Sequence, residues 1–235
     1  AGPIVRARDF LPQIRKPLFV SQEMFGRGVF LIICGLFKKA VMSDYISVNF
    51  VERIFENPAL YSGLENLMGV YGYALQIYYD FSGYSDMAIG IALLLGFHFN
   101  INFDSPYQSI SITDFWRRWH ISLSSWLRDY LYISLGGNRK GKWRQYLNLM
   151  ITMFLGGLWH GNTWNFVIWG SLHGMALVFH KLWMEKVSKR TRTDKPTGFN
   201  RFMGGLVTFH FVCFCWIFFR NVEFENSIVM INQIA

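Results

Sequence analysis

Apolar residues are gathered into runs along the chain, and polar or basic segments separate these runs. The runs are Phe25–Phe37, Leu67–Tyr79, Met87–Phe97, Leu147–Trp159, Trp164–Trp183 and Gly204–Phe219. A helix needs about 20 residues to cross a hydrocarbon core of ~30 Å. Only the run Trp164–Trp183 reaches that length without its flanks. The pattern predicts an all-α polytopic membrane protein, a multi-helix bundle in which some helices are short, broken or re-entrant.

The run Leu147–Trp159 would span only about 20 Å as a helix. It either extends into its flanks or ends part-way through the membrane. Gly156, Gly157 and Gly161 favour a break near its end and leave room for a substrate. The four residues that follow, "HGNT" from His160 to Thr163, are predicted to form a turn before the next helix.

The segment "DFWRRWHISLSSWLRDYLYISLGGNR" carries one apolar stripe at helical spacing. The stripe consists of Trp116, Trp119, Leu123, Trp126 and Tyr130, at steps of 3, 4, 3 and 4. Asp114 is the expected N-cap and Gly136–Gly137 the expected end. Arg117, Ser124 and Arg128 share another face. Two interpretations remain open: an amphipathic interfacial helix with its aromatic face in lipid, or a helix that folds back and presents His120 to a cavity.

Polar residues interrupt the apolar pattern in "YYDFSGYSDMAIG", Tyr78 to Gly90. The favoured interpretation is a turn between two spans. The alternative is a broken helix whose backbone lines a cavity. Asp80 and Asp86 are candidate functional residues in both, because burying a carboxylate in a membrane is costly.

Composition supports a membrane location: 52% of residues are hydrophobic, 18% are aromatic and 16% are charged, against about 25% charged in soluble domains. The net charge of +8 comes mainly from two basic loops, 98–144 and 181–201, which are expected to face the cytoplasm. Two apolar segments separate these loops, so His160 would lie between the membrane centre and the far side. The stretch "SKRTRTDKPTGFNR" within the second loop is linker-like. Because basic residues alternate with apolar segments and form no basic domain, nucleic acid is not an expected partner.

The chain is interpreted as a single membrane-embedded domain, residues 1–235, cut at both ends. Its first residues lack the features of a signal peptide, and its last residues stop inside an apolar stretch. Cys34, Cys213 and Cys215 lie in apolar runs without metal or disulfide spacing, so they are expected to behave as small hydrophobic residues.

Histidine is the main candidate for chemistry in so apolar a chain. No nucleophile elbow, phosphate-binding loop or dinucleotide fingerprint is present. Burial favours neutral imidazole, which can take a proton from a hydroxyl. Acyl transfer from a thioester needs such a base, a donor to the oxyanion and held reactants. His160 fits the base, and His120 could supply the donor or hold the acyl carrier. A metal or haem site at His173 and His180 is a weaker alternative, and no metal is expected.

Four stretches occur in the order found in membrane-bound O-acyltransferases, and together they span most of the chain. They are "GYALQIYYDFSGYSDMAIGIALLLGF", "SITDFWRRWHISLSSWLRDYLYISLGGNRKG", "YLNLMITMFLGGLWHG" and "WIFFRN". The chain resembles the bacterial branch that acetylates alginate, other extracellular polysaccharides or peptidoglycan, and more distantly the branch that carries D-alanine to teichoic acids. Ser134 stands where proline is common.

The resemblance implies a bundle with a tunnel through the bilayer, catalytic roles for His160 and His120, and a chain about twice as long. The expected donor is acetyl-CoA, a substrate rather than a bound cofactor. The expected partners are membrane lipids, an acetyltransferase- or esterase-like protein outside the cytoplasm and a polysaccharide acceptor, and the expected location is the bacterial inner membrane, crossed several times. Candidate substrate-binding residues are Trp119, Arg117, Arg118, Arg128, Asp80, Asp86 and Trp159. The competing hypotheses are a membrane exporter without chemistry and a non-catalytic scaffold for envelope assembly.

Overall fold

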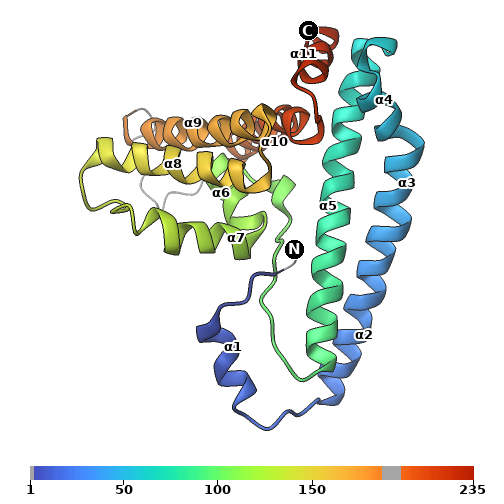
Figure 1. Ribbon diagram of the computed structural model, residues 1–235, viewed down its shortest axis with the longest axis vertical. Helices are drawn as coiled ribbons and strands as arrows, with labels where there is room; N and C mark the ends of the chain where they lie inside the picture. Colours follow the sequence, from blue (N-terminus) through green and yellow to red (C-terminus); the bar gives the residue numbers. More distant parts are fainter. Residues whose placement is uncertain (1–2, 187–196) are drawn as a thin grey trace.

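The computed structural model describes residues 3–186 and 197–235, and all regular secondary structure in them is helical. The longer helices are α1 (Ala7–Ile14), α2 (Gln22–Leu36), α5 (Gly63–Leu94), α8 (Lys142–His160), α9 (Trp164–Lys186), α10 (Gly198–Arg220) and α11 (Phe224–Ile234). The shorter ones are α3 (Asp44–Ile46), α4 (Glu52–Glu56), α6 (Ile112–Arg118) and α7 (Ile121–Trp126). The long pair formed by α2–α4 and α5 stands on one side, and α6 to α10 form a layered group beside it (Figure 1).

The first long rod runs from α2 to α4 with two π-helical stretches, η1 (Phe37–Ser43) and η2 (Ser47–Val51). It lies alongside α5, which starts at a capping box formed by Ser62 and Glu65. π-Turns change the direction in which side chains leave a helix. Here η1 carries Lys38 and Lys39, whose ammonium groups both reach carboxylates on α5.

Two pairs of glycines bring the rod and α5 into backbone contact. A Cβ placed on Gly83 would lie 2.7 Å from the carbonyl oxygen of Gly35, and one on Gly90 would lie 2.6 Å from that of Gly28. Both pairs are spaced by seven residues on antiparallel helices. Small residues permit this close approach, which is how helices pack where lipid removes the hydrophobic drive.

The polar segment 78–90 is the middle of α5, so the predicted turn and the predicted break are both wrong. The helix runs without interruption for 32 residues. Three of its polar side chains have partners on other elements: Asp80 pairs with Lys39, Asp86 with Lys38, and Ser85 with Asn102. Because these partners are remote in sequence, the local pattern shows only a cluster of polar residues, and such a cluster is typical of a loop.

The amphipathic segment is also not one helix. It divides into α6, α7 and the π-helical η5 (Leu127–Tyr132), with a break at Trp119 and His120. The N-cap is Ser111, which accepts a hydrogen bond from the Asp114 backbone N–H, so the prediction of Asp114 as cap is wrong by three residues. Because Trp119 is buried, the apolar stripe is not a lipid-facing surface throughout. The second interpretation is confirmed in that the segment folds back and buries Trp119 and His120, but His120 lines neither of the two cavities described below.

Helices α8 and α9 form a hairpin, and the predicted turn at 160–163 is confirmed. α8 gains length from its N-terminal flank and has 19 residues. The expected break does not occur at Gly156 or Gly157, since α8 continues to His160, and the helix ends at Gly161. Gly157 instead allows contact with α9, because a Cβ there would meet the Phe166 carbonyl oxygen at 2.3 Å. A Cβ on Gly161 would meet the Phe166 ring at the same distance, so this space is filled by protein and not left for a substrate.

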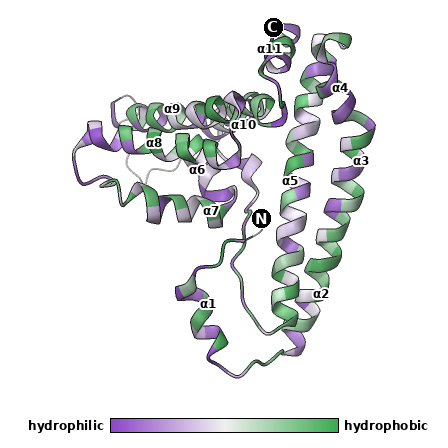
Figure 2. Ribbon diagram, viewed as in Figure 1, coloured by the Kyte–Doolittle hydropathy of each residue, from purple (hydrophilic) through white to green (hydrophobic). Residues whose placement is uncertain are grey.

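Hydrophobic residues predominate along α2 and α10, which are largely green in Figure 2, and many large hydrophobic side chains are exposed. Phe25, Phe30 and Ile33 on α2 and Val207 on α10 are among many exposed large hydrophobic side chains. Within the described ranges, α10 is the one helix that combines the length and the hydropathy needed to cross a membrane. Most of the linker-like stretch, residues 188–196, lies outside the described residues. Cys213 and Cys215 are buried and free, which confirms their role as packing residues.

We expect Gly83→Ala to destabilise the protein by about 1–3 kcal/mol, because a methyl group 2.7 Å from a backbone oxygen forces the helices apart. The matched control is Gly26→Ala, where a Cβ meets no atom within 4 Å and helix propensity should be neutral or stabilising. Thermal unfolding in detergent measures both. Equal stability of the two variants would contradict the close-packing role of Gly83.

Candidate active site

His120 occupies the break between α6 and α7 in a left-handed backbone conformation, with φ 43° and ψ 55°. A non-glycine residue in this region is uncommon. The loop before α6 holds it there: the Ile121 N–H donates to the Asn102 carbonyl at 2.9 Å, and the Asp104 N–H donates to the Arg118 carbonyl at 2.9 Å. This conformation turns the imidazole into the bundle, where it is 4% exposed.

The Asn102 side chain fixes the tautomer of His120. The Ser122 backbone N–H donates to Asn102 Oδ1 at 3.1 Å, so this atom is the carboxamide oxygen and accepts. Asn102 Nδ2 donates to Ser85 Oγ at 3.1 Å, which agrees with that orientation. His120 Nδ1 lies 3.2 Å from the same oxygen. Nδ1 therefore carries the proton, and Nε2 has a free lone pair in the neutral ring.

His160 is the last residue of α8 and lies within a ring of aromatic side chains. The centroids of Trp169 and Phe219 are 5.2 and 5.1 Å from its imidazole, and that of Phe166 is 6.4 Å away. Trp159 contributes a further ring at 5.0 Å but is itself 61% exposed. The enclosure comes from three helices, α8, α9 and α10, and leaves His160 partly accessible.

Aromatic packing connects the two histidine environments. Trp119, 4% exposed, packs 5.1 Å from Trp216, which in turn lies 5.2 Å from Phe219 beside His160. Trp119 is therefore a wall of the core between the histidines. Its predicted contact with substrate stays a prediction.

A cavity of about 940 Å³ lies between the α6–α7–η5 segment and the α8–α9 hairpin. Arg117, Arg128 and Lys181 line it, together with Ser124 and His180. The predicted polar face of Arg117, Ser124 and Arg128 thus faces a cavity. Trp116 and Ile121, which flank His120 in the chain, also line it, so the cavity extends toward the break that holds His120.

Arg118 and Arg128 differ in their surroundings. Arg118 lies outside this cavity and pairs with Asp114 at 3.0 Å and Asp104 at 3.6 Å. Arg128 pairs with Asp129 at 2.7 Å. Hydrogen bonds from Arg128 and Arg6 lower the pKa of the Asp129 carboxyl to about 2, so Asp129 is ionised at neutral pH and anchors the N-terminal segment to η5.

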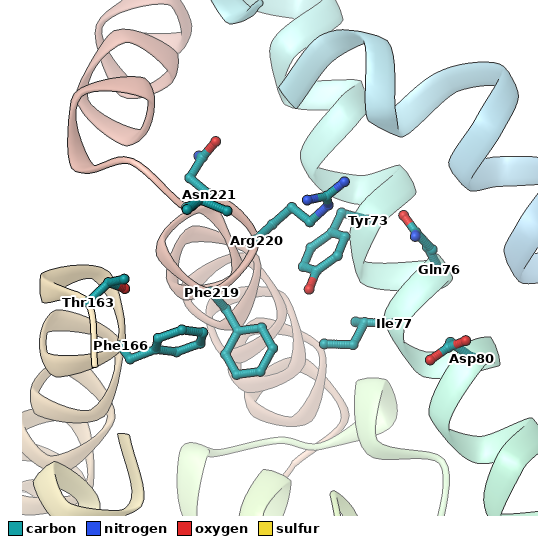
Figure 3. A pocket seen from close by; sticks show the side chains of 10 residues that line it. Tyr73, Gln76, Ile77, Asp80, Thr163, Phe166, Phe219, Arg220 and Asn221 are labelled. Carbon is teal, nitrogen blue, oxygen red and sulfur yellow. The ribbon is translucent and has the colours of Figure 1, made fainter. Parts of the chain in front are cut away.

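A second cavity, of about 400 Å³, lies between α5 and the ends of α9 and α10 (Figure 3). Asp80 lines it, whereas Asp86 is held by Lys38 at 2.6 Å. Phe166 and Phe219 form the wall that this cavity shares with His160. The two predicted carboxylates are therefore separated: only Asp80 lies close to the candidate site.

His173 and His180 do not converge. His173 is fully buried, and its Nδ1 accepts a hydrogen bond from Trp116 Nε1 at 3.3 Å. His180 Nδ1 lies 2.9 Å from Thr113 Oγ1 at the edge of the larger cavity. Within the ranges the structure describes, no group of three or more His, Cys, Asp and Glu side chains is arranged to hold a metal ion.

Sequence reasoning missed the residues that position the histidines. Asn102, Ser85 and Ser122 are isolated polar residues in a loop, a long apolar helix and a short helix, and no local pattern connects them. Arg220 does have a local signal, since it is the single basic residue at the end of the run Gly204–Phe219 and stands in "WIFFRN". Its place in the smaller cavity depends on packing with α5.

His120, His160 and two cavities lie within one group of helices, and among the described residues α10 is long and apolar enough to cross a membrane. The model of the MBOAT, membrane-bound O-acyltransferase family matches residues 1–221 of the chain. The chain belongs to this family, which confirms the resemblance drawn from its motifs.

Three bacterial proteins that are similar to the chain come from different branches of this family. The chain is 40% identical over 234 residues to a peptidoglycan O-acetyltransferase of Helicobacter pylori, covering 99% of this chain and 43% of that protein. It is 46% identical over 223 residues to a probable alginate O-acetylase of Pseudomonas syringae pv. tomato, covering 94% and 40%. A teichoic acid D-alanyltransferase of Bacillus subtilis is 29% identical over 237 residues, covering 96% and 59%. The chain spans about two-fifths of the length of the first two relatives.

We expect Asn102→Ala to reduce acyl transfer about 10–100-fold, because the His120 ring loses the acceptor that fixes its tautomer. Asn102→Asp keeps an acceptor at Nδ1 and should recover part of the rate. A carboxylate there favours the imidazolium, so the acidic limb of the pH–rate profile of Asn102→Asp should move to higher pH. Equal rates and identical pH profiles in the two variants would show that Asn102 acts only through folding.

Proposed function

We propose that the protein containing this chain is a bacterial membrane O-acetyltransferase. It moves acetyl from acetyl-CoA on the cytoplasmic side to a hydroxyl group of a polysaccharide, or of a partner protein, on the other side. The observation that supports this most directly is that buried His120 and half-buried His160 share one aromatic core, with a cavity lined by Arg117, Arg128, Lys181 and Glu185 nearby and a second cavity behind the rings that surround His160.

The larger cavity fits the donor. Arg117, Arg128 and Lys181 supply positive charge for the phosphates of a CoA thioester. Its volume of about 940 Å³ is within the ~300–1,000 Å³ typical of ligand sites. It lies at the ends of α8 and α9 that join the basic loops, which the positive-inside rule assigns to the cytoplasm.

His160 is the proposed general base. It takes the proton of the acceptor hydroxyl while the hydroxyl oxygen bonds to the thioester carbonyl carbon. The carbon–sulfur bond then breaks, and the imidazolium returns the proton to the leaving thiolate. Neutral His120 has its one N–H engaged with Asn102, so its Nε2 can only accept. We assign it to holding a substrate hydroxyl or N–H, in place of the oxyanion-donor role.

The membrane location and the partner protein follow from a donor site on the cytoplasmic side and an acceptor on the other side. The chain would cross the inner membrane several times, with lipid on the apolar outer faces. An acetyltransferase- or esterase-like partner outside the cytoplasm would receive or distribute the acetyl group. A simple exporter is less well supported, because the intramembrane carboxylates that would line its pathway, Asp80 and Asp86, are paired with Lys39 and Lys38.

We expect His160→Ala in the full-length protein to lower acetyl transfer at least 100-fold, the scale of a lost general base. His120→Ala should cause a smaller or equal loss. The control is His210→Ala, an exposed histidine of α10 that bonds only the Leu206 carbonyl. The measurements are acetyl content of the cell's polysaccharides and turnover of labelled acetyl-CoA by the purified protein. Retained acetylation by His160→Ala at normal protein levels would refute the base assignment.

We expect Arg117→Gln to raise the KM for acetyl-CoA about tenfold or more with little change in kcat, since the lost charge-assisted hydrogen bond serves binding. Arg118→Gln is the matched control, because Arg118 is adjacent in sequence yet points to Asp114 and Asp104 outside the cavity. If both variants raise KM equally, the cavity is not the donor site.

A further inference from the structure

His173 is a fully buried histidine that has no part in the proposed reaction. It lies on α9, and aromatic side chains from α6, α9 and α10 enclose its imidazole. The nearest ring centroids belong to Trp169 at 4.9 Å, Trp116 at 5.1 Å, Phe211 at 5.6 Å and Phe115 at 6.2 Å. Burying an imidazole among such rings is costly unless its nitrogens form hydrogen bonds.

One of the two nitrogens of His173 is used by Trp116 of α6. The indole Nε1 of Trp116 donates a hydrogen bond to His173 Nδ1 at 3.3 Å. An indole N–H can only donate, so Nδ1 is the acceptor and the neutral ring carries its proton on Nε2. Within the described ranges, Nε2 has no partner. A phenylalanine would fill the same space without burying an unpaired N–H, so the physical reason for an imidazole here is the acceptor at Nδ1.

Trp116 connects this hydrogen bond to the larger cavity, which it lines beside Arg117. The indole of Trp116 is half-buried, and Trp169 packs behind it with a centroid distance of 5.8 Å. Contacts between rings are not strongly directional, whereas a hydrogen bond is. The bond to His173 therefore fixes the rotation of the indole, and with it the shape of this part of the cavity wall.

A second histidine of α9 contacts the same face of α6. His180 Nδ1 lies 2.9 Å from Thr113 Oγ1, and Thr113 precedes Trp116 by three residues, which places both on one face of the helix. Thr113, Trp116 and His180 all line the larger cavity, but His173 does not. His180 can thus touch a ligand of the cavity directly, whereas His173 can act on it only through Trp116.

His173 also packs against the ring beside the proposed base. Trp169 is 2% exposed, and its centroid lies 4.9 Å from that of His173 and 5.2 Å from that of His160. The imidazole of His173 therefore lies between a wall of the larger cavity and the aromatic side chains that enclose His160.

We infer that His173 is a positioning residue for the acyl donor. Its Nδ1 holds the Trp116 indole in one orientation at the wall of the larger cavity, so that the donor meets a surface that is already ordered. This inference rests on the proposed function in naming the ligand of the cavity an acyl thioester. The hydrogen bond between Trp116 and His173 does not depend on that function.

The test compares His173→Asn with His173→Leu in the purified full-length protein. The two new side chains have similar shapes, but Asn places an acceptor oxygen near the position of Nδ1 and Leu has none. We expect His173→Leu to raise the KM for acetyl-CoA about tenfold, the scale of a buried donor left unpaired, and His173→Asn about threefold or less. The kcat values of the two variants should be similar. In a Trp116→Phe background, which lacks the N–H donor, the two substitutions should give the same KM.

Fluorine NMR of protein labelled with fluorotryptophan tests the hydrogen bond without turnover. The resonance that is missing in Trp116→Phe belongs to Trp116. It should shift in His173→Leu, stay near its wild-type position in His173→Asn, and shift when acetyl-CoA is added to the wild-type protein. If His173→Leu does not fold, His173→Phe replaces it, because it keeps an aromatic ring and lacks the acceptor.

Equal KM values for the Asn and Leu variants, or a difference that persists with Trp116→Phe, would overturn the inference. A Trp116 resonance that is the same in both variants would do so as well. If the wild-type protein turns over acetyl-CoA normally, these results refute this inference alone. A wild-type protein that neither turns over acetyl-CoA nor shifts its Trp116 resonance with it contradicts the proposed function, and the resonances of the variants then still decide whether His173 orients Trp116.

Discussion

Burying a polar side chain in an apolar bundle is costly unless another group of the protein satisfies it. Contacts of this kind hold the elements around the candidate site together. Lys38 and Lys39 of the π-helical stretch η1 form ion pairs with Asp86 and Asp80 on α5. Asn102, in the loop before α6, bonds to His120 at the break between α6 and α7. Each contact joins elements that are far apart in sequence, so satisfying polar groups also fixes how the helices stand relative to one another.

The same constraint prepares the candidate site. Asn102 is itself oriented by Ser122 and Ser85, so the His120 tautomer is determined before any substrate arrives. A ring held in this way needs no reorganisation on binding. His160 is held differently, by aromatic rings rather than hydrogen bonds. The proton position of His120 is thus set by hydrogen bonds, whereas the position of the His160 ring is set by aromatic contacts.

Glycines serve close packing at several helix contacts, including Gly157, where the sequence suggested a break. Gly157 and Gly170 let α8 and α9 touch, and Gly35 and Gly83 do the same for the rod and α5. The expected break in α8 does not occur, because a glycine in a helix is tolerated where it permits a neighbouring backbone to approach. As a result His160 ends a rigid helix, and its position is set by the α8–α9 contact.

The sequence by itself determined the helical class, the turn at 160–163, the family and the two histidines worth testing. These depend on the period of apolar residues and on contiguous motifs, which are local properties of the chain. It could not determine that 78–90 is continuous helix, that the amphipathic segment breaks at His120, or that Arg117 and Arg118 face different surroundings. Only the tertiary structure decided these points, because the groups that stabilise each conformation, such as Lys39 for Asp80 and Asn102 for His120, come from other elements and leave no trace in the local pattern.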